Sequence, residues 1–383
     1  MYNFSYQNPV NIVFGKNEIG KLSELLAKDS KIMIIYGGGS IKKNGVYDQV
    51  VKALEGYSYI EFGGIEPNPK YETLMNAIVL GKKEKVDFLL AVGGGSVIDG
   101  TKFIAAAIPM DRDPWDIMLG NAEVEKAVPI GTILTLPATG SEMNSGAVIS
   151  RISTKEKYAF MSPWVMPKFS ILDPEVCYSL PKRQVANGIV DAFVHTIEQY
   201  LTYPVNAMVQ DYFSESLLKT LIEIAPKVMK EQPEYDDCAN FMWTATMALN
   251  GLIGCGVPQD WATHEIGHEL TALHNIDHAR TLAIVLPGVM NVMRNAKRDK
   301  LEQYAYRIWN ISAGSSEERI NQAIQKTEDF FESVGINTHL KDYDVNETTI
   351  GMISERFKER KTLLGERQDI GYGTVAEILR SRL

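Results

Sequence analysis

The chain has few cysteines, no excess of positive charge and no long hydrophobic run. Its three cysteines, Cys177, Cys238 and Cys255, are scattered over 383 residues, too few and too far apart for a disulfide framework or a cysteine-rich zinc site. We expect them to be small buried hydrophobes in a reducing compartment. No run approaches the ~20 apolar residues of a membrane-spanning helix, and the first residues lack the pattern of a signal peptide. These absences predict a cytoplasmic protein.

The net charge argues against some classes of binding partner. A formal net charge of −9 argues against nucleic acid or a membrane surface as a partner. It does not exclude an anionic cofactor, provided that a local pocket supplies hydrogen-bond donors. The hydrophobic share of 45% and the length of 383 residues are those of a globular protein with two or three domains.

Short apolar runs followed by turn residues dominate the first half of the chain. Residues 31–36, 88–92 and 130–136 read as buried strands, each ending in a turn rich in glycine, serine or proline. Continuous apolar strands separated by helical segments predict a mostly parallel sheet covered on both faces. Beyond residue 183, long helical patterns take over, at residues 183–200, 206–227, 236–252 and 319–334. We therefore predict an α/β dinucleotide-binding domain at 1–183 and an all-α domain for metal and substrate at 184–383.

A glycine-rich turn follows the second strand. In Gly93-Gly-Gly-Ser-Val-Ile-Asp99 the glycines allow close backbone approach to a pyrophosphate, and the following helix start offers free N–H groups. Ser96, Asp99 and Lys102 can either fasten this turn or touch the ligand. The motif is not G-x-G-x-x-G, so it does not define a standard Rossmann domain. A tight turn without a ligand is the alternative to a nucleotide site.

The turn after the first strand bears on the choice of nucleotide. An acid in this place grips the ribose 2′-hydroxyl of NAD, but here the chain reads Gly37-Gly-Gly-Ser-Ile-Lys-Lys43. Ser40, Lys42 and Lys43 can attract a 2′-phosphate. The turn therefore favours NADP(H) over NAD(H).

Five of the six histidines fall within residues 195–278, and only His339 lies outside. Three pairs have the i, i+4 spacing that places two side chains on one helix face: Asp191 and His195, His264 and His268, His274 and His278. Imidazole and carboxylate ligands suit Zn²⁺ or Fe²⁺ without distinguishing them. The segment predicts a divalent metal site.

A metalloprotease is a competing interpretation. His264-Glu-Ile-Gly-His268 is a literal H-E-x-x-H in which Glu265 would be the general base, with His274 where a metzincin places its third ligand. However, Thr271 stands where that pattern needs a glycine, and a protease does not explain the α/β half of the chain. We expect the protease-like motif to be accidental.

Taken together, the motifs resemble those of the iron-containing (group III) alcohol dehydrogenases, most closely their NADPH-dependent butanol dehydrogenase-like branch. They run along nearly the whole chain and include Gly93-Gly-Gly-Ser96 with Asp99 and Lys102, Pro137-Ala-Thr-Gly-Ser-Glu142, Asn187-Gly-x-x-Asp191-x-x-x-His195, Gly256-Val-Pro-Gln-Asp-Trp-Ala-Thr-His264, and Gly267-His268 with Asn275-x-x-His278. The resemblance implies an α/β dinucleotide-binding domain followed by an all-α domain, the dehydroquinate synthase-like architecture.

The resemblance also implies roles for single residues. The metal ligands would be one aspartate and three histidines: Asp191, His195, His264 and His278. His268 would lie beside the nicotinamide or substrate, where it or a water–ribose chain carries the proton; His274 and His339 receive no role. The cofactor contacts would be Gly94, Gly95, Ser96 and Asp99 at the pyrophosphate and nicotinamide, Thr135, Thr139, Asn144 and Lys157 at the ribose and nicotinamide, and Gly38, Ser40 and Asn68 at the adenosine end.

The implied function is that of a metal-dependent alcohol dehydrogenase or aldehyde reductase. Hydride would pass reversibly between NADP(H) and short- to medium-chain aldehydes or primary alcohols such as butanal and butanol, with the substrate oxygen held on Fe²⁺ or Zn²⁺. Members of the family commonly form homodimers. A relative resembling glycerol dehydrogenase or dehydroquinate synthase is an alternative, although no basic cluster accompanies the histidines, and a non-catalytic binding module is another.

Overall fold

The computed structural model describes residues 1–383, and their contacts divide them into two units. The α/β unit comprises residues 7–185 and 231–246, and the helical unit comprises residues 1–6, 186–230 and 247–383. No helix combines the length and the apolar character needed to cross a membrane. A boundary between functional domains at residue 183 stays a prediction.

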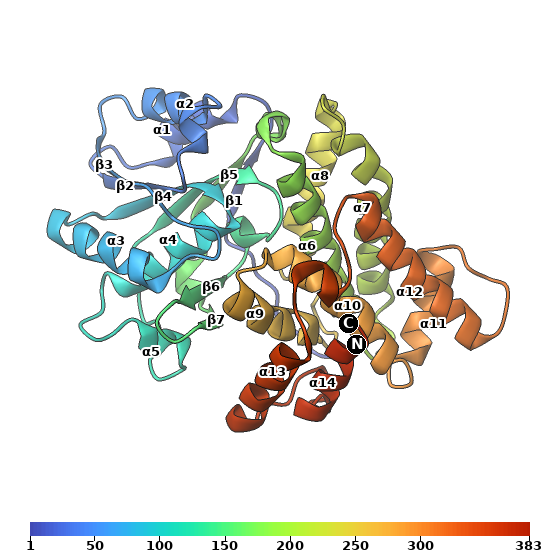
Figure 1. Ribbon diagram of the computed structural model, residues 1–383. Helices are drawn as coiled ribbons and strands as arrows, with labels where there is room; N and C mark the ends of the chain where they lie inside the picture. Colours follow the sequence, from blue (N-terminus) through green and yellow to red (C-terminus); the bar gives the residue numbers. More distant parts are fainter. The chain divides into compact units, whose positions relative to one another are not determined.

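The α/β unit is built on a parallel sheet of six strands (Figure 1). In spatial order the strands are β1 (Asn11–Phe14), β8 (Phe169–Leu172), β5 (Ile130–Leu136), β4 (Phe88–Gly94), β2 (Lys31–Tyr36) and β3 (Ser58–Phe62). The central strands β2 and β4 pair in register, with Ile32 opposite Phe88, and their middle residues are fully buried. Apolar side chains on both faces of a strand require a cover on both faces, which explains the continuous apolar runs.

Helices cover both faces of this sheet. They are α1 (Leu22–Leu25), α2 (Val46–Ala53), α3 (Tyr71–Glu84) and α4 (Gly95–Ala107), whereas the short α5 (Trp115–Met118) contacts β7. Figure 1 shows α1 and α2 on one side of the sheet and α3 and α4 on the other. The hairpin of β6 (Gly146–Arg151) and β7 (Glu156–Met161) is a separate antiparallel pair.

The order of the strands places two glycine turns next to each other. After β2 the chain moves outward to β3, and it then returns to the opposite side of β2 to form β4. The turns that leave β2 and β4 therefore flank the topological switch point, where open α/β sheets bind ligands outside the carboxyl ends of their strands. The predicted strands are confirmed, with β4 extending two residues further, to Gly94.

Most of the second half of the chain belongs to the helical unit. Its helices are α6 (Lys182–Tyr200), α7 (Met208–Val228), α9 (Ala262–His274), α10 (His278–Val292), α11 (Arg298–Arg307), α12 (Ser316–Ser333), α13 (Glu347–Arg360) and α14 (Tyr372–Arg380), while most of α8 (Tyr235–Ala248) belongs to the α/β unit. Ile266, Ile284, Ile353 and Ile378, one each from α9, α10, α13 and α14, are fully buried in one core. The predicted fold class, a parallel α/β domain followed by an all-α domain, is confirmed.

Helix α6 is buried along most of its length. Every residue from 188 to 200 is buried, so this part of the helix is covered on all sides. Its polar side chains must find partners because an unsatisfied polar group in the interior is costly. Gln199 illustrates this: its Nε2 donates to the carbonyls of His195 at 2.8 Å and Ala248 at 2.9 Å.

The three cysteines are free and buried, as predicted.

The end of α8 differs from the prediction. The helix predicted at 236–252 ends earlier, at Ala248. The reason is a local turn in which Asn250 Oδ1 accepts the N–H of Leu252 at 3.0 Å and Gly251 has a φ of 89°, a conformation that ends a helix at low cost only in glycine.

Candidate active site

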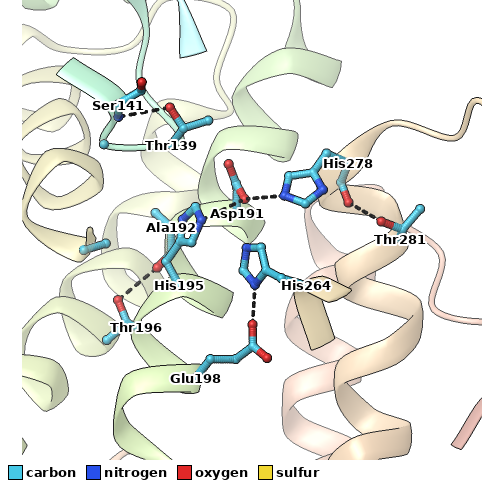
Figure 2. A network of polar contacts seen from close by, with 12 residues as sticks. Thr139, Ser141, Asp191, Ala192, His195, Thr196, Glu198, His264, His278 and Thr281 are labelled. Atoms are coloured by element: carbon cyan, nitrogen blue, oxygen red, sulfur yellow. Dashed lines mark hydrogen bonds and ion pairs between the residues drawn. The ribbon is translucent and has the colours of Figure 1, made fainter. Parts of the chain in front are cut away.

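Three helices of the helical unit bring together the four predicted metal ligands. Asp191 and His195 come from α6, His264 from α9, and His278 is the first residue of α10. Figure 2 shows the carboxylate of Asp191 with the three imidazole rings around it.

The distances within this group are short enough for a single cation. The ligand atoms of Asp191, His195 and His264 all lie within 4.8 Å of one another. Oδ1 of Asp191 is 3.7 Å from Nε2 of His195 and 3.8 Å from Nε2 of His278. The rings of His264 and His278 have centroids 5.2 Å apart. One carboxylate and three imidazoles therefore converge on one place.

Burial prepares these side chains for a cation. It lowers the pKa of His195 to about 4, and this effect outweighs the opposing charge of Asp191. The imidazole is thus neutral near pH 7, which is the form that binds metals. A buried carboxylate, when ionised, carries a negative charge that a divalent cation would compensate. This donor set is chemically suited to Zn²⁺ or Fe²⁺.

Glu198 is a residue of this site that the sequence analysis missed. It follows His195 by three residues on α6 and is only 2% exposed. Its Oε1 accepts the N–H of Thr263 at 2.6 Å, and its Oε2 contacts Nδ1 of His264 (Figure 2). The available signal was its position: Asp191, His195 and Glu198 are spaced i, i+4, i+7 and share one helix face.

The prediction that His274 and His278 share one helix face was wrong. His274 and His278 do not share a helix face, because His274 ends α9 and His278 begins α10. Between them Asn275 has a φ of 55°, a left-handed conformation that ends the first helix. His274 Nε2 lies 2.9 Å from Oγ1 of Thr349, so the two histidines have separate surroundings.

The remaining histidines differ in their distance from this group. His268 is buried, and its ring centroid is 5.3 Å from that of His278 and 6.3 Å from that of His264. It thus lies beside the predicted ligands. His339 precedes the 3-10 helix Leu340–Tyr343 and is not part of the group.

A hydrogen bond joins the start of α10 to α6. Nδ2 of Asn187 donates to Oδ2 of Asp277 at 2.9 Å. Asn187 lies one turn before Asp191, and Asp277 directly precedes His278. The bond thus ties together the backbone segments that carry these two predicted ligands.

In the α/β unit, the glycine turn leads directly from β4 into α4. Gly94 is the N-cap residue of α4, and no side chain caps the helix start. A Cβ at Gly95 would lie 2.4 Å from the side chain of Thr139, so packing alone requires glycine there. A Cβ at Gly38, in the turn after β2, would meet nothing within 4 Å. Packing within the protein therefore does not require glycine at position 38.

Asp99 and Lys102 fasten the neighbouring loop. The fully buried ammonium of Lys102 donates to the carbonyl of Asn144 at 2.9 Å, to its Oδ1 at 3.0 Å and to the carbonyl of Gly146 at 2.8 Å. Oδ1 of Asp99 accepts from Oγ of Ser141 at 2.6 Å. Burial lowers the pKa of Lys102 to about 8, against the charge of Asp99. The sequence left open whether Asp99 and Lys102 fasten this region or touch a ligand. These hydrogen bonds support the fastening role.

Three other predicted cofactor residues contact one another. Nζ of Lys157 donates to Oδ1 of Asn68 at 3.0 Å, and the N–H of Asn68 donates to Oγ of Ser96 at 3.3 Å. Asn68 has a φ of 54°. Thr135, near the end of β5, is nearly buried, and Thr139 Oγ1 accepts the N–H of Ser141 at 3.2 Å.

Lys42 differs from its expected role. Its ammonium lies 3.0 Å from Oε2 of Glu61 on β3, and it sits over the rings of Tyr36 and Tyr47 at 4.8 and 4.5 Å. Its charge is thus already engaged. Of the three residues expected to attract a phosphate after β2, Ser40 and the exposed Lys43 are the ones without this ion pair.

The parallel sheet with glycine turns and the helical unit with a histidine-rich centre define a class of enzyme built from a nucleotide-binding half and a metal-binding half. Two family models match the chain: "Iron-containing alcohol dehydrogenase" over residues 9–174 and "Fe-containing alcohol dehydrogenase family, C-terminal" over residues 185–383. The chain belongs to the iron-containing alcohol dehydrogenase family, and it is an oxidoreductase. The resemblance inferred from the motifs is confirmed.

Particular relatives are similar over the whole length. The NADPH-dependent aldehyde reductase YqhD of Escherichia coli (strain K12) is 58% identical over 374 residues, which are 97% of each chain. The crystal structure of E. coli K-12 YqhD superimposes with a TM-score of 0.98 over 100% of this chain and 99% of that one, at 56% identity. The NADH-dependent butanol dehydrogenase A of Thermotoga maritima gives 0.95 at 38% identity, over 100% and 99%.

Proposed function

We propose that the chain is a metal-dependent aldehyde reductase and alcohol dehydrogenase that transfers hydride reversibly between NADP(H) and short- to medium-chain aldehydes or primary alcohols, such as butanal and butanol. The observation that carries this proposal is the convergence of Asp191, His195, His264 and His278 in a buried site. The family and the name of the aldehyde reductase relative support the reaction class.

In this proposal the four converging residues hold Fe²⁺ or Zn²⁺. The bound cation supplies Lewis-acid polarisation of the substrate oxygen. The side chains provide the conditions for it: Asp191 contributes one negative charge, and the burial that keeps His195 neutral leaves its nitrogen ready to bind. His268, beside His278, is proposed to carry the proton to or from the substrate oxygen.

The proposed nucleotide site is the face of the α/β unit at the carboxyl ends of β2, β4 and β5. The uncapped start of α4 offers N–H groups and the positive end of the helix dipole to a pyrophosphate. The proposed contacts remain Gly38, Ser40, Asn68, Gly94, Gly95, Ser96, Asp99, Thr135, Thr139, Asn144 and Lys157. The geometry described above gives Asp99 a supporting part, since it holds the loop that carries Asn144.

NADP(H) is proposed in preference to NAD(H). No acidic residue follows β2 within the turn, whose residues from 37 to 43 include only glycine, serine, isoleucine and lysine. Ser40 and Lys43 remain to meet a 2′-phosphate. Relatives differ in this respect: by their names, YqhD is NADPH-dependent and the Thermotoga enzyme is NADH-dependent.

Further parts of the proposal concern the cell and the assembly. We propose functional domains at 1–183 and 184–383, a cytoplasmic location, a homodimer, and neither nucleic acid nor membrane as a partner. The net charge of −9 supports the last point. The small-molecule substrate is the remaining partner.

An oxidation assay tests the function. NADPH consumption is followed with a series of short- and medium-chain aldehydes, on protein reconstituted with Fe²⁺, with Zn²⁺ or with no metal. Turnover is expected only with metal, and His264→Ala is expected to lose both metal and turnover. Turnover in metal-free protein, or full activity of His264→Ala, would refute the proposed ligands.

A further inference from the structure

Glu198 is a buried polar side chain of α6 that connects this helix to the start of α9. Both of its carboxylate oxygens are engaged from the same short segment, by the N–H of Thr263 at 2.6 Å and by Nδ1 of His264. The segment begins α9, so a carboxylate of one buried helix holds the first turn of another. Figure 2 shows the imidazole of His264 between this carboxylate and the Asp191 group.

This contact bears on which nitrogen of His264 carries hydrogen. An ionised carboxylate has only acceptors, so in that form of Glu198 the imidazole nitrogen that it contacts is the donor. With the hydrogen on Nδ1, the lone pair of the neutral ring lies on Nε2. A metal needs that lone pair, and a hydrogen bond to the opposite ring nitrogen also fixes the orientation of the ring.

A buried ion-pair cluster supports the same segment from behind. The ammonium of Lys297, itself 3% exposed, lies 2.6 Å from Oδ2 of Asp260 and 2.6 Å from Oε2 of Glu366. Asp260 donates its N–H to the carbonyl of Glu198 at 2.9 Å, and its Oδ1 accepts the N–H of Ala262 at 3.0 Å. Glu198, Asp260 and Lys297 also line one small cavity. The entry into α9 is therefore tied to the end of α6 on two sides.

We propose that Glu198 is the positioning residue of the metal centre, which holds His264 as the Nδ1–H tautomer with Nε2 toward the cation, and that the Lys297 cluster keeps the entry into α9 in place for this contact. The inference rests on the proposed function only in taking His264 as a ligand. Glu198 acts through His264 and touches neither substrate nor nucleotide in this scheme.

The substitution Glu198→Gln tests the proposal because it changes few atoms. Glutamine has one side-chain oxygen and one NH₂ group, whereas Thr263 N–H and His264 Nδ1–H need two acceptors. Either the helix start loses its acceptor or the imidazole meets a donor, which favours the opposite tautomer. We expect the dissociation constant for Zn²⁺, measured by competition with a chromophoric chelator, to rise about 10- to 100-fold. The visible absorption bands of the Co²⁺-loaded protein should also shift.

Glu328→Gln is the matched control. Glu328 is a buried glutamate of the same unit whose Oε1 lies 2.9 Å from Arg382, away from any proposed ligand. This variant should lose stability while keeping the Zn²⁺ affinity and the Co²⁺ spectrum of the parent protein. Equal weakening of Zn²⁺ binding in both variants would mean a general structural effect and would overturn the proposal.

A second variant covers the case in which Glu198→Gln does not fold. Glu198→Asp keeps the charge but withdraws it by one methylene, so weaker Zn²⁺ binding is expected here too. Parent-like Zn²⁺ affinity in a folded Glu198 variant overturns the positioning role and leaves the proposed function intact. Absence of stoichiometric Zn²⁺ or Co²⁺ binding in the parent protein would instead count against the proposed metal centre itself.

Discussion

Gly38 offers a direct test of the proposed nucleotide site. It lies in the turn after β2, outside the left-handed region of φ, and an added Cβ would contact nothing within 4 Å. The protein alone therefore tolerates alanine. A methyl group would instead enter the space that the proposal assigns to the adenosine end of NADPH.

Gly38→Ala should thus separate stability from binding. Replacing glycine by alanine at a compatible backbone position stabilises by ~0.4–1 kcal/mol, through the unfolded chain. A methyl group forced into a filled contact costs ~1–3 kcal/mol, which corresponds to a rise of about 5- to 150-fold in the dissociation constant of NADPH. Fluorescence titration with NADPH measures the binding, and the thermal unfolding midpoint measures the stability.

Gly20→Ala serves as the comparison. Gly20 lies in the 3-10 helix Glu18–Lys21 of the same unit, is exposed like Gly38, and also has nothing within 4 Å of an added Cβ. It should gain the same small stability without any change in NADPH affinity. If Gly38→Ala binds NADPH as tightly as the parent protein, the turn after β2 is not a cofactor contact and the reasoning fails.

Three further predictions concern the metal site and one surface cluster. Glu265→Gln should keep aldehyde reductase activity to within about tenfold, although removal of a general base costs ~10²–10⁴-fold. Removal of metal by a chelator should abolish aldehyde reduction while NADPH binding, followed by fluorescence, persists. Burial raises the pKa of Glu61, but hydrogen bonds led by Tyr47 and Lys42 lower it overall. The stability that Glu61 contributes should thus be present above its ordinary pKa and disappear as the pH falls through the lowered one. The difference in unfolding midpoint between the parent protein and Glu61→Gln should therefore shrink in acid.

Each of these three predictions can be contradicted by a specific experimental result. Loss of reductase activity in Glu265→Gln, with folding intact, would restore a catalytic role for that carboxylate. Loss of NADPH binding together with the metal would mean that the two sites are not independent. A difference in unfolding midpoint that stays constant from neutral to acid pH would show that the pKa of Glu61 is not depressed.

Much of the architecture was predictable because local chemistry determines it. The strands β2, β4 and β5 are continuous apolar runs that end in turn residues, and burial on both faces allows few other interpretations. The spacing of Asp191 and His195 likewise predicted one helix face. Helix ends were less predictable: α8 stops early because of a side-chain bond within the turn at Asn250.

The parts that were not predictable depend on partners distant in sequence. Glu198 reads as an ordinary polar residue near a helix end, and only the fold reveals its contact with His264, 66 residues away. Lys42 reads as a free cation until β3 places Glu61 beside it. His274 and His278 have helical spacing, but Asn275 ends the helix between them. Periodicity describes one element at a time, whereas these features arise between elements.

The break at Asn275 has a consequence for insertions and deletions. Only Asn275, Ile276 and Asp277 separate α9 from α10, and His278 owes its direction to being the first residue after them. Successive residues of an α-helix differ by roughly 100° in direction. One residue more or less in this link would swing the imidazole away from its companions or move it out of the helix. The connection therefore does not tolerate variation in its length.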